Sequence, residues 1–89
     1  MKAVQARITG RVQGVGFRYW ALRRAQFLGL SGWVRNEADG SVSLLLIGPE
    51  QQVEQMLLWC QDGPPAARVE DIQTTPLSSL PPISGFSIR

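Results

Sequence analysis

The sequence predicts a single α+β domain over residues 1–89, with two helices packed on one face of an antiparallel sheet. Three observations support this class. The periodicity of the apolar residues follows the order strand, helix, strand, strand, helix, strand. Glycine or proline residues separate most of these segments. The chain has 89 residues, 44% hydrophobic and 18% charged, which is enough for one modest core and too few charges for disorder.

The first part of the chain predicts a strand, a glycine-rich loop and a helix. Residues 3–9 alternate between apolar and polar types, as expected of a half-buried strand with Val4, Ala6 and Ile8 on its buried face. Gly29 is predicted to end the following helix, because glycine readily adopts the left-handed conformation found there. We expect Trp20 in the core or in a cleft wall. The apolar face of this helix has helical spacing and comprises Phe17, Trp20, Ala21, Ala25 and Leu28.

The middle of the chain predicts a β-hairpin and a second helix. Residues 32–36 and 41–47 fit two antiparallel strands joined by a turn at Asp39-Gly40. Pro49 suits the start of a helix, and Cys60 lies on its apolar stripe, so we assign this cysteine to the core rather than to catalysis. Segment 62–65 ends the helix because its glycine and two prolines cannot continue it. The predicted buried stripe comprises Val53, Met56, Leu57 and Cys60.

The last part of the chain completes the sheet. Residues 68–74 predict a fourth strand, and residues 76–84, with three prolines and three serines, predict a surface loop. Phe86 and Ile88 suggest a short extra strand at the C-terminus. The order βαββαβ with right-handed crossovers gives a ferredoxin-like fold, in which both helices cover one face of a four-stranded antiparallel sheet. The first strand is central, and its end leads into the glycine-rich loop.

Segment 10–18, GRVQGVGFR, is the strongest candidate for a binding site. Gly10, Gly14 and Gly16 allow positive φ angles, so consecutive backbone N–H groups can point at one anion. Arg18 follows in the first turn of a helix, where a cation costs about 0.3–1 kcal/mol unless an anion lies nearby. Its planar guanidinium can bind two oxygens of a phosphate. The alternative is an ordinary turn followed by a solvated arginine.

The absence of certain residue types restricts the ligands and reactions that we expect for this loop. The loop has neither the Gly-Lys-Ser/Thr ending of a nucleotide-binding P-loop nor the third glycine of a dinucleotide fingerprint, so we expect no bound nucleotide. Val12 stands six positions before Arg18, where a cysteine phosphatase would have its nucleophile. The chain has no histidine and no cluster of metal-ligating residues, so we expect no metal site. We expect Glu37 and Asp39 to belong to a solvated turn.

GRVQGVGFR, followed by LGLSGWVRN and DGSV, closely resembles the acylphosphatases, from about Ile8 to Arg68 and weakly to the C-terminus. The resemblance implies a small cytosolic enzyme that hydrolyses the carboxylic–phosphoric anhydride of acyl phosphates without metal or cofactor. It implies that Asn36 positions the attacking water, whereas the residues alone fit a loop-capping asparagine better. Many family members have threonine where this chain has Ala21, which puts help from a hydroxyl there in question. The resemblance also implies that the phosphate is held by Arg18 and by the backbone N–H groups of Val12, Gln13, Gly14, Val15, Gly16 and Phe17.

Charge and cysteine content indicate the partners and the compartment. Residues 1–36 have seven Lys/Arg and no Asp/Glu, a net charge of +7, whereas residues 37–89 have two and seven, a net charge of −5. The basic first part would attract small anions. The single cysteine excludes an internal disulfide, and no leader or long apolar run follows Met1, so we expect a cytoplasmic protein without a membrane partner.

Two binding functions compete with an enzyme. RNA-recognition modules share this topology and stack bases on aromatic residues of the third strand. Here that strand, SVSLLLIG, has none, so we do not expect nucleic acid to bind. The second alternative is a non-catalytic sensor that binds phosphate or another small anion with the same loop. As an enzyme, the protein should bind inorganic phosphate as a product inhibitor. The family resemblance suggests a monomer, although Leu58 and Trp59 lie off the buried stripe and could form a contact patch.

Overall fold

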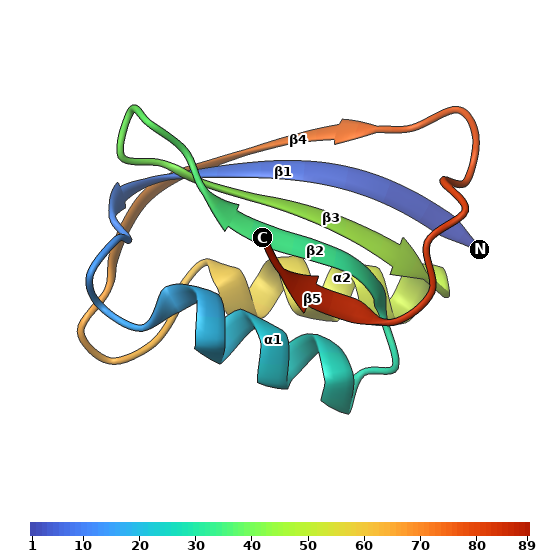
Figure 1. Ribbon diagram of the computed structural model, residues 1–89, viewed down its shortest axis with the longest axis horizontal. Helices are drawn as coiled ribbons and strands as arrows, with labels where there is room; N and C mark the ends of the chain where they lie inside the picture. Colours follow the sequence, from blue (N-terminus) through green and yellow to red (C-terminus); the bar gives the residue numbers. More distant parts are fainter.

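The computed structural model describes residues 1–89 and shows a five-stranded sheet with both helices on one face (Figure 1). The strands have the spatial order β4-β1-β3-β2-β5. The first four strands pair antiparallel, and β5 adds to β2 in parallel. The predicted ferredoxin-like α+β fold with an extra C-terminal strand is therefore confirmed. The elements are β1 (Lys2–Arg11), α1 (Phe17–Phe27), β2 (Ser31–Asn36), β3 (Val42–Gly48), α2 (Glu50–Cys60), β4 (Arg68–Pro76) and β5 (Phe86–Ile88).

Every predicted element is present, and most ends differ by one or two residues. Gly29 has a φ of 70° just after α1, so its predicted role in ending this helix is confirmed. Pro49 directly precedes α2, at the predicted start of the helix. β1 extends to Arg11 because β4 continues to pair with it beyond Thr9.

Gly10 has a different role from the one we expected. It lies in β1 at a register shift against β4, with a φ of 123°. A Cβ atom at this position would lie 2.2 Å from the carbonyl oxygen of Arg68 and 2.8 Å from the amide nitrogen of Glu70. Glycine is therefore needed for the close approach of two strands. Gly10 thus permits the close pairing of β1 with β4, and it does not line the cavity described below.

The main core lies between the helices and the sheet. Its strand residues include Val4, Ala6 and Ile8, as predicted. Cys60 is also in this core, and burial raises the pKa of its thiol to about 12, which makes it an inert apolar residue. Three residues predicted on the apolar helix faces are only half-buried and lie at the border of the core, namely Trp20, Leu28 and Leu57. The helices contribute Phe17, Ala21 and Ala25 from α1 and Val53, Met56 and Cys60 from α2.

The opposite face of the sheet carries a second, smaller apolar cluster. The segment 77–84 runs from β4 to β5, and its Leu77 and Ile83 pack on this cluster. The sequence predicted only a surface loop here, because the prolines and serines obscure these two apolar residues. The segment leads into β5, which is held beside β2 by backbone hydrogen bonds from Gly32 N to Gly85 O (2.9 Å) and from Arg89 N to Val34 O (2.8 Å). The cluster comprises Ala3, Trp33, Leu45 and Ile47.

Candidate active site

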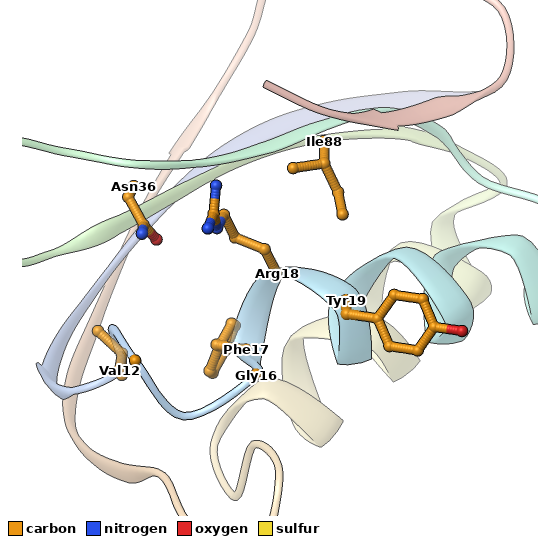
Figure 2. A pocket seen from close by; sticks show the side chains of 8 residues that line it. Val12, Gly16, Phe17, Arg18, Tyr19, Asn36 and Ile88 are labelled. Carbon is orange, nitrogen blue, oxygen red and sulfur yellow. The ribbon is translucent and has the colours of Figure 1, made fainter.

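A cavity of about 250 Å³ lies where the loop after β1 meets the N-terminus of α1 and the end of β2 (Figure 2). The topology produces this meeting point. β1 and β2 both flank β3 and run antiparallel to it, so their ends lie at the same edge of the sheet. The cavity is lined by Val12, Gly14, Gly16, Phe17, Arg18, Tyr19, Asn36 and Ile88.

The loop presents backbone N–H groups that have no partner in the protein. None of the amides from Val12 to Phe17 donates a hydrogen bond within the chain. Gly14 and Gly16 have φ angles of 75° and 80°, as their predicted role requires. The buried side chains of Val12 and Phe17 anchor the two ends of the loop in the core. Unpaired donors next to a helix N-terminus form a favourable environment for an oxyanion.

Not all six residues whose backbone amides were predicted to bind phosphate line the cavity. The residues at four of the six predicted positions line it, namely Val12, Gly14, Gly16 and Phe17. Val15 does not line it, and its side chain packs against the core. Gln13 also does not line it, because its side chain is directed to the β2–β3 hairpin.

Arg18 is the second residue of α1 and has no acidic partner. The two ion pairs of the chain are Arg7–Asp39 and Arg35–Glu37, and α1 has no acidic residue in its first turn. Figure 2 shows the guanidinium of Arg18 directed above the loop towards Asn36, with Ile88 on its other side. An unpaired cation beside unpaired N–H groups concentrates positive potential in one small space, which favours a bound anion.

Asn36 is the last residue of β2 and faces Arg18 across the cavity (Figure 2). Its backbone is held by its position opposite Val42 in the β2–β3 pair. Its side chain makes no hydrogen bond within the chain, so it does not cap the adjacent turn. The structure therefore brings together the two side chains that the sequence singled out, from positions 18 residues apart.

Gln13 connects the loop to the hairpin that follows Asn36, and the sequence analysis missed this role of its side chain. Its amide nitrogen donates hydrogen bonds to the carbonyl oxygens of Glu37 (2.8 Å) and Ser41 (2.9 Å). These bonds fix the distance between the loop amides and the end of β2. No local pattern could reveal them, because the partners are 24 and 28 residues away along the chain.

Tyr19 and Ile88 are two further residues of the cavity wall that the sequence analysis did not identify. Ile88 reaches the site because β5 pairs in parallel with β2, where it lies opposite Val34. Tyr19 follows Arg18 in α1, and Figure 2 shows its ring directed away from Arg18 along the helix. Ala21 is fully buried in the core and does not line the cavity.

The acidic residues of the hairpin lie in a largely exposed turn, as expected, and both are also hydrogen-bonded. Glu37 accepts hydrogen bonds from Ser43 Oγ (2.9 Å) and Arg35 Nε (3.1 Å), and these lower the pKa of its carboxyl group below the ordinary value of 4.5. Asp39 pairs with Arg7. Neither carboxylate lines the cavity. No group of three or more His, Cys, Asp or Glu is arranged to hold a metal ion, and no helix is long and apolar enough to cross a membrane.

Comparison with known proteins identifies the family. The model of the acylphosphatase family matches residues 4–88. The chain belongs to this family. It is 53% identical to an acylphosphatase of Rhodospirillum rubrum over 87 residues, which covers 98% of this chain and 94% of that protein. An acylphosphatase of Rhizobium meliloti is 51% identical over 87 residues, covering 98% of this chain and 92% of that protein.

The same family is found among solved structures. The acylphosphatase of Bacillus subtilis superposes with a TM-score of 0.97 and is 39% identical, with 100% of this chain and 99% of that chain covered. The five-stranded arrangement described above thus belongs to the acylphosphatase fold. The family resemblance predicted from GRVQGVGFR and LGLSGWVRN is confirmed.

Proposed function

We propose that this acylphosphatase hydrolyses the anhydride bond of acyl phosphates in the cavity between the β1–α1 loop and Asn36. The products are a carboxylate and inorganic phosphate. Family membership supports this reaction. One observation carries the proposed site, namely that Val12, Gly14, Gly16 and Phe17, whose backbone amides are unpaired, line the same cavity as Arg18, which forms no ion pair.

In this proposal, Arg18 and the loop amides hold the phosphoryl group. The guanidinium binds two phosphoryl oxygens at once, while the N–H groups and the N-terminus of α1 face the remaining negative charge. Phosphoryl transfer needs little covalent help from a protein, so positioning and stabilisation of charge account for most of the catalysis. These donors are in place before substrate binds, because the loop is anchored by Val12 and Phe17.

Asn36 is proposed to position the attacking water. Its carbonyl oxygen accepts a hydrogen bond from the water, which directs the water oxygen at phosphorus. The new P–O bond forms as the bond from phosphorus to the acyl oxygen breaks, and the acyl oxygen leaves with the electron pair as a carboxylate. The chain has no histidine and no carboxylate lines the cavity, so we assign the proton of the water to a phosphoryl oxygen of the substrate.

Further properties follow from this mechanism. Inorganic phosphate, as product, competes with the substrate for the loop. The reaction uses no metal or cofactor, since all the charge stabilisation comes from groups of the chain. We also propose that the 89 residues act as one monomeric cytoplasmic domain.

The test compares hydrolysis of benzoyl phosphate by the parent, Arg18→Lys and Asn36→Ala. Arg18→Lys should lose at least about 100-fold in kcat/KM, because one ammonium group cannot replace a bidentate planar contact. Asn36→Ala should lower kcat much more than it raises KM, because water placement acts on the transition state. Addition of EDTA should change none of these rates.

Circular dichroism of each variant serves as the control for folding. Hydrolysis by folded Arg18→Lys within about tenfold of the parent, or roughly 1.4 kcal/mol of barrier, would contradict the role of Arg18. A loss in Asn36→Ala confined to KM would make Asn36 a substrate-binding residue. Absence of hydrolysis by the parent would support the alternative of an anion sensor.

A further inference from the structure

We propose that Gly63 is a positioning residue for the phosphate-binding loop between β1 and α1, and that it acts through the ring of Phe17. This inference rests on the proposed function, because it concerns the same loop amides. Gly63 does not line the cavity and lies in the connection from α2 to β4. We call residues 61–67 the α2–β4 turn. This turn and the β1–α1 loop lie at the same end of the molecule (Figure 1).

Phe17 belongs both to the phosphate-binding loop and to the core. It is the first residue of α1, its backbone N–H has no partner in the chain, and it lines the cavity next to Arg18. Its side chain is buried, and the centroid of its ring lies 5.3 Å from that of Trp20. Because close-packed side chains transmit displacement to their neighbours, a shift of this ring also moves the backbone at the start of α1.

The backbone of Gly63 lies directly against the ring of Phe17. A Cβ atom at position 63 would lie 2.9 Å from Cε2 and 3.4 Å from Cδ2 of Phe17, and 3.2 Å from Cβ of Ala67. Ordinary van der Waals contact begins at 3.4 Å. The ring would therefore have to retreat by about 0.5 Å, the difference between 3.4 and 2.9 Å, to make room for one methyl group. Glycine thus allows the turn to support the ring at its observed position.

The α2–β4 turn is fixed by hydrogen bonds, so the ring is the part that has to move. The backbone N–H of Gly63 donates a hydrogen bond to the carbonyl oxygen of Trp59 in the last turn of α2 (3.0 Å). Farther along the turn, the N–H of Ala67 donates to the carbonyl oxygen of Pro64 (2.9 Å), and Pro64 is buried. Movement of the turn would break bonds at the end of α2, whereas movement of the ring of Phe17 breaks none.

The phosphate-binding loop is thus supported from two sides. Gln13 connects it to the hairpin that follows Asn36, and the contact between Gly63 and Phe17 supports the end at which α1 begins. A binding site has to be held within about 0.5 Å of its productive geometry. A displacement of 1 Å can cost about 100-fold in rate, so a shift of about half that size should weaken phosphate binding about tenfold.

A purely structural role for Gly63 predicts a different result. The φ of Gly63 is 68°, which is unfavourable for most other residues. If this were the only reason for glycine, its replacement would lower the melting temperature and leave the phosphate affinity of the folded protein unchanged. Phosphate affinity therefore separates the two roles.

The experiment measures the inhibition constant of inorganic phosphate against benzoyl phosphate in the parent, Gly63→Ala and Gly29→Ala. Gly29 is the matched control, because it also follows a helix and has a φ of 70°, but a Cβ atom there would meet nothing within 4 Å. Both variants should lose stability because of the φ angle. We expect only Gly63→Ala to raise the inhibition constant, about five- to tenfold. Assays well below the melting temperature of each variant exclude a contribution from unfolded protein.

A second comparison tests whether Phe17 transmits the effect. Leucine lacks the outer edge of the ring, so Gly63→Ala added to Phe17→Leu should raise the inhibition constant less than about twofold relative to Phe17→Leu alone. If Gly63→Ala does not fold, Gly63→Asn and Gly29→Asn take the place of the two alanine variants, because asparagine tolerates a positive φ better than alanine.

Three outcomes would overturn the inference and leave the proposed function intact. They are an unchanged inhibition constant in the folded Gly63 variant, an equal rise in the Gly29 variant, and a rise of the same size with and without Phe17→Leu. A parent that neither hydrolyses benzoyl phosphate nor binds phosphate would overturn both the inference and the proposed function.

Discussion

Gly10 gives the fold its most specific test, because its replacement by alanine adds only one methyl group. That group would lie 2.2 Å from the carbonyl oxygen of Arg68 and 2.8 Å from the amide nitrogen of Glu70, both in backbone that cannot move without disturbing β4. The φ of 123° at Gly10 is also unfavourable for alanine. Gly10→Ala should therefore force β1 and β4 apart next to the β1–α1 loop.

The magnitude has two parts. A non-glycine residue at such a φ costs about 1–3 kcal/mol. Separation of the strands at this point weakens about two backbone hydrogen bonds, at roughly 0.5–1.5 kcal/mol each. We expect the free energy of unfolding to fall by about 2–6 kcal/mol, and the melting temperature by about 10 °C or more for a domain of this length.

Gly40→Ala is the matched control. Gly40 has a φ of 93°, but a Cβ atom there would meet nothing within 4 Å. The variant therefore has the energetic cost of an unfavourable φ angle without the steric clash. Urea unfolding followed by tryptophan fluorescence, together with thermal unfolding, gives the free energy for each protein. Gly10→Ala should be the less stable of the two by about 1–3 kcal/mol. Equal destabilisation of the two variants would refute the close approach at Gly10.

Two further predictions concern the hairpin next to Asn36. Gln13→Leu keeps the size of the side chain but removes both hydrogen bonds to the hairpin. Because Asn36 is then displaced, kcat for benzoyl phosphate should fall about tenfold or more. An unchanged kcat in the folded variant would show that Gln13 does not position Asn36. The pKa of Glu37 is lowered in the folded protein, so its charge stabilises the fold above pH 4.5, and this stabilisation is lost as the pH falls through the folded pKa. Glu37→Gln should therefore be less stable than the parent at pH 7, and the difference should shrink below about pH 4.5 in urea titrations; a difference independent of pH would contradict the cause assigned to the shift.

The sequence predicted those parts of the fold that depend on local periodicity. Phe17, Ala21 and Ala25 are buried as their spacing indicated, since a helix places residues three and four apart on one face. Gly29 ends α1 for an equally local reason, its φ of 70°. The alternation in residues 3–9 identified the buried face of β1, and the order of the elements then determined the sheet.

Contacts between distant parts of the chain could not be predicted in this way. The hydrogen bonds of Gln13 to the hairpin and the position of Ile88 in the cavity depend on which strands become neighbours. The same holds for Leu77 and Ile83, whose apolar partners come from β1, β2 and β3. Gly10 shows the opposite error, because a local pattern assigned it to the loop although its conformation is required by β4. Asn36 was identified through the family resemblance, and only the structure shows it facing Arg18.

The binding of inorganic phosphate tests the central claim most directly, namely that the β1–α1 loop and Arg18 form an anion site. Phosphate at 100 times its dissociation constant should stabilise the parent by about 2.7 kcal/mol, because it binds only the folded state. The melting temperature should then rise by on the order of 10 °C relative to chloride at the same ionic strength. In Arg18→Gln, which retains a polar side chain but loses the charge and the bidentate geometry, this rise should be absent. An equal rise in the parent and in Arg18→Gln would contradict the account, because phosphate would then bind elsewhere on the basic first part of the chain.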